Sequence, residues 1–241
     1  MEKCAAVSLQ KGIYVFPSFF PEALLAFSTR EFDASKDLLF FLKSLGISPE
    51  RSFTIKQVHG NHVVWARSPN LNETIEADGI VTQEKGLALV IRTADCVPLF
   101  LWDPESQAVG LVHVGWRGAQ KGIVRQAVEM LEQTFQSKPP RLLAALGPAI
   151  RECCYEVGEE FQNYFPGFVR ESAGRHRFDL AGFVKSELEA LGIPKDSMID
   201  SGICTACSVD RFFSARREGQ ETGRFPSVIM IKCPSEKGRK L

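Results

Sequence analysis

The sequence lacks the features that would assign it to a nucleic-acid-binding or membrane class. Its 29 basic and 29 acidic residues leave no net charge, whereas nucleic acids and anionic membranes require clustered positive charge. The basic clusters at 175–177 and 237–240 are short and typical of solvated surface. No apolar run approaches the roughly 18–20 residues that cross a bilayer, and residues 1–16 lack a secretory-signal pattern. We therefore expect a soluble, cytoplasmic protein that binds neither nucleic acid nor a membrane.

Cysteine and histidine occur in numbers that exclude further classes. Seven cysteines, an odd number without close spacing, predict reduced thiols instead of a disulfide framework. Cys204 and Cys207 form the one C-x-x-C, and without a second pair they predict two free thiols instead of a zinc knuckle. Adjacent Cys153 and Cys154 are expected to point in different directions, which disfavours joint ligation. Four histidines are too few for a multicopper oxidase, which needs several close histidine pairs.

The apolar pattern predicts an α/β (α+β) protein in which residues 1–241 form one domain on one mixed sheet. No G-x-G-x-x-G or Walker sequence follows a strand-like run. The runs at 87–102 and 141–146 are apolar throughout, as strands covered on both faces are. Turn residues at 103–106 predict an antiparallel hairpin, and Asp179 is a predicted helix cap. The expected strands are 53–58, 62–66, 87–92, 97–102, 108–113, 141–146 and 227–232, and the expected helices are 35–45, 121–135, 156–165 and 179–191.

Two imidazoles and one thiol lie where strand-like runs end, at His59, Cys96 and His113. Such a set suits zinc, and three protein ligands leave a fourth position for water or substrate. The gaps between them match no short metal motif, so the fold would have to bring the three together. A buried structural role is the alternative for each residue. His62 is expected on another strand face and His176 on the surface.

Glycines and arginines around two turns predict an anion site. In HVGWRG, Gly115 and Gly118 flank a turn before a helix, where backbone N–H groups and Arg117 favour an anion. A later loop supplies further guanidinium groups, from Arg211, Arg216, Arg217 and Arg224. Arg216 or Arg217 would complete a phosphate pocket with Arg117. The alternatives are an ordinary strand-to-helix turn and surface arginines.

Seven motifs resemble, in order, those of the YfiH-type laccase-domain family: KQVHG, ADGIVT, TADCVP, HVGWRG, LGPAI-x-x-CCYEVG, ICT and FFSARREG-x-x-TGR. They span about residues 53–231. Members of that family are described as purine nucleoside phosphorylases with adenosine deaminase activity. Older names are polyphenol oxidase, multicopper laccase and peptidoglycan editing factor. The resemblance implies a mixed-sheet sandwich flanked by helices, similar to the catalytic domain of cytotoxic necrotizing factor toxins.

Carried over by position, the family's metal ligands fall on His59, Cys96 and His113. Zinc is the metal that the resemblance implies, and copper is the alternative. Asp95, next to Cys96, is a candidate for orienting a ligand or handling a proton, with a strand-end cap as the alternative. The family often has Tyr or His where this chain has Ala215, so substrate preference is expected to differ.

The resemblance favours zinc-dependent phosphorolysis of purine nucleosides such as adenosine, inosine or methylthioadenosine, with phosphate as co-substrate. Adenosine deamination would be secondary, because His113 is followed by Val-Gly-Trp and the His-x-Glu proton shuttle of other zinc deaminases is absent. A Cys96–His113 hydrolase or amidase in peptidoglycan editing stays open. So do a copper-dependent polyphenol oxidase, which the few histidines disfavour, and a non-enzymatic binding protein. The pattern assigns no oligomeric state.

Overall fold

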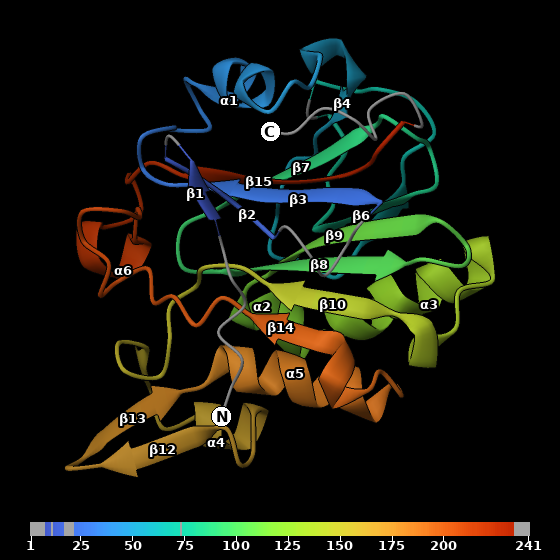
Figure 1. Cartoon of the computed structure of the whole chain (residues 1–241). Helices are drawn as coiled ribbons and strands as arrows, with labels where there is room; N and C mark the ends of the chain where they lie inside the picture. Colours follow the sequence, from blue (N-terminus) through green and yellow to red (C-terminus); the bar gives the residue numbers. More distant parts are fainter. Residues whose placement is uncertain (1–7, 11, 17–21, 73, 234–241) are drawn as a thin grey trace.

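Two six-stranded β-sheets form the centre of the computed structural model, which describes residues 8–10, 12–16, 22–72 and 74–233 (Figure 1). The first sheet runs, in spatial order, through β1 (Ser8–Gln10), β2 (Ile13–Val15), β3 (Ala23–Ser28), β15 (Phe225–Ile231), β7 (Ala88–Thr93) and β4 (Ser52–Phe53). The second runs through β14 (Met198–Asp200), β10 (Leu143–Leu146), β8 (Val97–Asp103), β9 (Ala108–Val114), β6 (Gly79–Thr82) and β5 (Val63–Trp65). A small third sheet consists of β11 (Glu156–Val157), β13 (Arg175–Phe178) and β12 (Val169–Ser172).

Both large sheets are mixed, because each combines antiparallel pairs with parallel ones such as β4 with β7 and β5 with β6. The prediction of an α/β class with mixed sheets flanked by helices is confirmed. The expectation that one sheet contains all the strands is wrong. The strands divide into two sheets because each large sheet is apolar on both faces and needs a cover on each.

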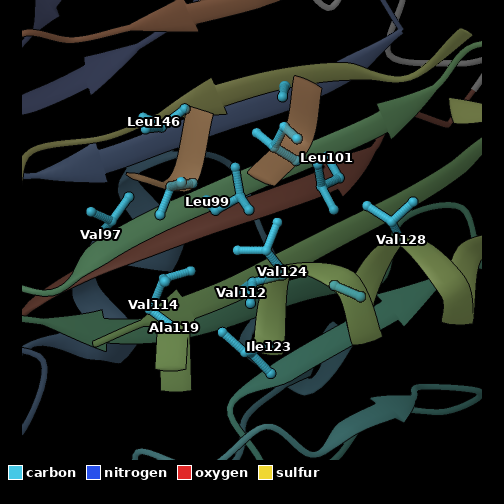
Figure 2. Close-up of a cluster of buried hydrophobic side chains, with 14 of the residues drawn as sticks. Val97, Leu99, Leu101, Val112, Val114, Ala119, Ile123, Val124, Val128 and Leu146 are labelled. Atoms are coloured by element: carbon cyan, nitrogen blue, oxygen red, sulfur yellow. The ribbon is translucent and has the colours of Figure 1, made fainter. Parts of the chain in front are cut away.

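Strands that are apolar throughout are buried on both faces. Along β8, Leu99 and Leu101 point into the core beneath the helices, whereas Phe100 and Trp102 point into the core between the sheets. Because successive side chains of a strand point to opposite faces, a strand between two cores needs an apolar residue at every position. Figure 2 shows the β8 side chains facing Val124 and Val128 of the adjacent helix. Burying one such side chain contributes about 1.5–3 kcal/mol.

Helices cover the outer face of each large sheet. The helix α3 (Ile123–Phe135) buries the apolar face that its periodicity predicts, and α5 (Leu180–Ala190) begins at Asp179, whose Oδ1 accepts the Gly182 N–H at 2.8 Å. Both lie against the second sheet, while α1 (Leu38–Ser44) covers the first. The remaining helical segments are short: α2 (Trp116–Gln120), α4 (Phe161–Tyr164), α6 (Ala215–Glu218), η1 (Pro49–Arg51), η2 (Pro139–Arg141) and η3 (Lys195–Ser197). No helix among the described residues has the length and apolar character to cross a bilayer.

Two expected elements are shorter than the pattern suggests. The helix expected at 156–165 is reduced to α4, because Glu156 and Val157 pair with β13 instead. The strand expected at 53–58 ends at Phe53, and the N–H groups of Thr54 and Lys56 donate instead to the carbonyl oxygens of Asn70 and Ile75. In both segments tertiary pairing overrides local propensity. The expected hairpin of 97–102 with 108–113 is confirmed as the antiparallel pair β8–β9.

Candidate metal centre and adjoining cleft

His59, Cys96 and His113 converge where β8 begins and β9 ends. Their ligand atoms all lie within 4.8 Å of one another, and Cys96 Sγ is 3.9 Å from His59 Nε2. The antiparallel register explains the meeting, because Pro98 pairs with His113 and Cys96 is two residues before Pro98. His59 reaches the same point from the loop after Val58 with a positive φ of 57°. The structure therefore brings the three candidate ligands together.

The buried carboxylate of Asp78 holds two of these ligands in place. Its Oδ1 lies 2.8 Å from His113 Nδ1 and accepts the His59 backbone N–H at 2.9 Å. Its Oδ2 accepts the Gly60 N–H at 2.6 Å, which fixes the turn after His59. When Nδ1 of His113 donates to Asp78, its Nε2 is left as the ligand atom, as in many carboxylate-supported metal sites.

Charge on Cys96 and His113 is mutually stabilised. Burial raises the pKa of the Cys96 thiol, but the combined effect of the neighbouring His113 and His59 is larger and lowers this pKa to about 6. Burial lowers the pKa of His113, while Cys96 and Asp78 raise it, to about 9. The site therefore favours a thiolate at neutral pH, which is the form that ligates zinc and also the form that attacks as a nucleophile.

Close approach explains the two glycines of HVGWRG. A Cβ on Gly115 would stand 3.0 Å from Cys96 Sγ and 3.0 Å from His59 Cδ2. A Cβ on Gly118 would stand 2.7 Å from the Gly60 carbonyl oxygen. These glycines, which the sequence assigns to phosphate binding, therefore also let α2 pack against the loops that present the ligands.

A cleft of about 790 Å³ adjoins the three ligands and is lined by several cationic side chains. Arg117 lies over the Trp116 ring at 4.4 Å, and Arg216 lies over the Tyr155 ring at 5.4 Å. Among the residues that the structure describes, neither guanidinium forms an ion pair with a carboxylate. Asp95 is the one acidic residue in the lining, which also includes Lys56, Arg92 and Arg224. This balance favours an anionic ligand.

Both carboxylate oxygens of Asp95 accept hydrogen bonds. Oδ1 accepts from Thr205 Oγ1 at 2.6 Å, and Oδ2 accepts from Ser214 Oγ at 3.1 Å and from the Arg216 N–H at 2.7 Å. The side chain therefore joins the start of β8 to the start of α6. This geometry matches the capping alternative and leaves Asp95 at the edge of the cleft.

The other predicted residues are distributed around this site. Arg217 donates to the carbonyl oxygens of Thr205, Ala206 and Phe212 and does not line the cleft, whereas Ala215 and Arg216 do. His62 Nδ1 lies 2.9 Å from the Glu76 carbonyl oxygen, and His176 lies on β13. Sequence reasoning missed Asp78 and Tyr155, although both stand inside motifs, ADGIVT and CCYEVG, that carry the family resemblance.

The cysteines of the C-x-x-C do have a second pair, contrary to the sequence-based expectation. The sulfur atoms of Cys153, Cys154, Cys204 and Cys207 all lie within 4.8 Å of one another. A parallel bridge between Ala149 and Cys204 lays the two loops side by side. Cys153 and Cys154 lie in a turn, where adjacent side chains can face one side, instead of in a strand, where they alternate.

Comparison with known proteins assigns the chain to a family. Residues 33–232 match the model described as multi-copper polyphenol oxidoreductase laccase. The chain belongs to this laccase family. It is 37% identical over 182 residues to a purine nucleoside phosphorylase of Bacteroides thetaiotaomicron, covering 71% of this chain and 67% of that protein. It is also 37% identical over 192 residues to one of Deinococcus radiodurans, covering 77% and 72%.

Solved structures of the laccase family have the same fold. YlmD from Geobacillus stearothermophilus superposes with a TM-score of 0.87 at 25% identity, over 94% of this chain and 99% of that one. The Bacillus licheniformis hypothetical protein YfiH superposes with a TM-score of 0.86 at 24% identity, over 92% and 97%. The resemblance to YfiH-type proteins is therefore confirmed. The laccase family is metal-associated by its description, and relatives named as phosphorylases support a phosphorylase-like activity within it.

Proposed function

We propose that the protein is a zinc-dependent purine nucleoside phosphorylase, which converts a purine nucleoside and phosphate into the free base and a pentose 1-phosphate. One observation carries the proposal. The cleft places three candidate metal ligands beside two arginines that have no carboxylate partner among the described residues. The relatives named as purine nucleoside phosphorylases support the choice of reaction.

The chemistry of the donors His59, Cys96 and His113 fits zinc. Two imidazoles and a thiolate, one imidazole braced by Asp78, match its preferred ligands, and the set faces a cleft instead of being closed. When bound, zinc would supply a Lewis acid or an activated water to the cleft. Copper is the competing ion, because imidazole and thiolate ligate it as well.

Arg117 and Arg216 would hold the phosphate, since a guanidinium binds a phosphate through paired hydrogen bonds. A phosphate oxygen then forms the bond to C1′ of the pentose while the bond from C1′ to the purine breaks. The purine leaves with the electron pair of that bond and takes up a proton. The rings of Trp116 and Tyr155, both in the lining, place apolar surface next to these two guanidinium groups, where the base would pack. Asp95 acts as a positioning residue, because it holds the backbone of Arg216.

Adenosine deamination remains a secondary prediction. It requires a carboxylate that exchanges a proton with the substrate. Within the lining of the cleft that carboxylate is Asp95, whose two oxygens already accept three hydrogen bonds. We therefore propose phosphorolysis as the main reaction.

A cysteine hydrolase is a second candidate because of one observation. Cys96, His113 and Asp78 follow one another as thiolate, imidazole and carboxylate, in the arrangement of a nucleophile, its base and an orienting acid. Its substrate would be an amide, such as one in a peptidoglycan precursor. Metal bound by Cys96 and a free nucleophile at Cys96 are mutually exclusive, so the two candidates are separable.

Phosphate dependence tests the proposed function. Zinc-loaded protein is incubated with inosine or adenosine, with and without phosphate, and the free base and pentose 1-phosphate are measured. We expect base release only when phosphate is present, loss of activity after chelation, and recovery when zinc is added. Base release at the same rate with and without phosphate would contradict phosphorolysis. Full activity after chelation would favour the hydrolase.

A further inference from the structure

The cysteine cluster, defined as Cys153, Cys154, Cys204 and Cys207, has the sulfur spacing of a four-coordinate metal site. Cys207 Sγ lies 3.6 Å from the sulfur of Cys153 and 3.3 Å from that of Cys154, and all four sulfurs lie within 4.8 Å. Four thiolates at about 2.3 Å from a tetrahedral zinc ion would stand about 3.8 Å apart. The two separations from Cys207 are slightly shorter than that value, and none of the others exceeds 4.8 Å.

Apolar packing does not explain these cysteines. A free cysteine is usually a buried hydrophobic side chain, yet Cys153 and Cys207 are exposed and only Cys204 is buried. Exposed thiols gain little from contact with one another, whereas a shared cation would hold all four in place.

We propose that the cysteine cluster is a second metal site, which binds one zinc ion through four thiolates and has a structural role. Zinc sites with four cysteine ligands are closed to substrate and stabilise the fold around them. The ligands are separate from His59, Cys96 and His113, so this proposal does not depend on the proposed function.

The bound ion would join two loops that border the cleft. One loop follows β10 and contains Cys153, Cys154 and the cleft residue Tyr155. The other follows β14, and in it Thr205, between Cys204 and Cys207, donates to Asp95 Oδ1 at 2.6 Å. The cysteines of the two loops are at least fifty positions apart, so a bound ion would hold together segments distant in the sequence, and its binding free energy would stabilise the folded state. The site would thereby fix the positions of Asp95 and Tyr155.

Metal content distinguishes the two sites. We expect wild-type protein, purified without chelator, to hold about two zinc ions per chain by elemental analysis. The Cys204→Ser/Cys207→Ser variant should hold about one, and so should Cys96→Ser, each losing a different ion. Cys233→Ser is the matched control, because Cys233 belongs to neither set, and it should keep both ions. A wild type with one ion that the Cys204→Ser/Cys207→Ser variant retains would overturn the proposal.

Thiol labelling in the wild type needs no substitution and so avoids a variant that fails to fold. Zinc-loaded protein is treated with iodoacetamide, and labelled cysteines are identified by mass spectrometry. Although Cys153 and Cys207 are exposed, bound zinc should slow their labelling by about tenfold or more relative to chelated protein. Equal labelling rates with and without zinc would refute the site. So would a disulfide between Cys154 and Cys207 in freshly purified protein, since those sulfurs could not then both ligate a metal.

Discussion

Replacing Asp78 with Asn is the sharpest test of how the candidate metal centre is held. Oδ1 of the carboxylate lies next to His113 Nδ1 and accepts the His59 N–H, and Oδ2 accepts the Gly60 N–H. Asparagine preserves the shape of the side chain but replaces one acceptor oxygen by an NH2 donor. Either the pair at Oδ1 or the two hydrogen bonds at Oδ2, from the Gly60 and Val58 N–H groups, must then face a second donor.

The expected cost follows from the hydrogen bonds that the substitution removes. Hydrogen bonds to a charged group contribute about 1.5–3 kcal/mol each, and removing the buried charge offsets part of the loss. We expect Asp78→Asn to lower the free energy of unfolding by roughly 2–4 kcal/mol, which corresponds to roughly 5–15 °C in the melting temperature. Loss of the carboxylate behind His113 should also weaken zinc binding roughly 10–100-fold.

The assay measures zinc affinity by competition with a chromophoric chelator and stability by thermal unfolding. Asp103→Asn is a matched control, because Asp103 is also buried and accepts from the Glu105 N–H and Ser106 Oγ at the other end of β8. The control should lose stability but keep its zinc affinity within about twofold. If Asp78→Asn loses stability but binds zinc like the wild type, Asp78 supports the fold and not the ligands. If it loses neither, the hydrogen-bond geometry described above is wrong.

Two further substitutions test other parts of the site, and a third tests an ion pair outside it. Arg117→Ala should raise the KM for phosphate by roughly tenfold or more and change the melting temperature by less than about 2 °C. Arg125→Ala, at an exposed arginine, is the control. Equal loss of phosphate use and stability would indicate that Arg117 has a structural role. Cys96→Ser should lose zinc and activity together, because a hydroxyl is a poorer zinc ligand than a thiolate. In the wild type, rapid alkylation of Cys96 despite bound zinc would favour the hydrolase. Burial raises the pKa of Asp200, but Arg151 at 2.6 Å lowers it, and the net pKa is below the ordinary value of 3.8. The ion pair therefore stabilises the fold above about pH 4, and this stabilisation is lost as the pH falls through the lowered pKa. Asp200→Asn should therefore be less stable than the wild type by roughly 2–3 kcal/mol at pH 7. Thermal unfolding should show that this difference shrinks below about pH 4. A difference that does not change with pH would exclude a contribution from the ionised Asp200.

Sequence reasoning reached Cys96 and His113 because they lie at the ends of β8 and β9, whereas it reached His59 from a longer strand than the structure has, since β4 ends at Phe53. Apolar runs show where strands stop, and polar residues at those ends stand on a rigid scaffold. The antiparallel pair β8–β9 was predictable from its turn, and its register alone brings Cys96 close to His113. The residues alone suggested these three ligands but left structural roles open, and the family resemblance strengthened the metal hypothesis.

Asp78 was not predictable in the same way. It precedes β6, and only the pairing of β6 with β9 places it behind His113, where its Oδ1 lies 2.8 Å from Nδ1. Asp78 and His113 are 35 positions apart in the sequence, so no local pattern connects them. The cysteine cluster was missed for a related reason: Ala149 and Cys204 form an isolated bridge, and no local pattern predicts one.

The loop that holds Cys204 and Cys207 also contacts Asp95, whose two carboxylate oxygens accept three hydrogen bonds. Thr205, held between two cysteines of the cysteine cluster, donates to Oδ1, while the start of α6 donates to Oδ2. The carboxylate is therefore a junction between the strand that presents Cys96, the loop of the cysteine cluster and the helix that presents Arg216. A zinc ion bound by the cysteine cluster would fix the loop that contains Thr205, and a phosphate bound by Arg216 would contact the helix α6. Because packed junctions transmit small displacements, we expect removal of the cysteine cluster to weaken phosphate binding without any change in the residues that contact phosphate.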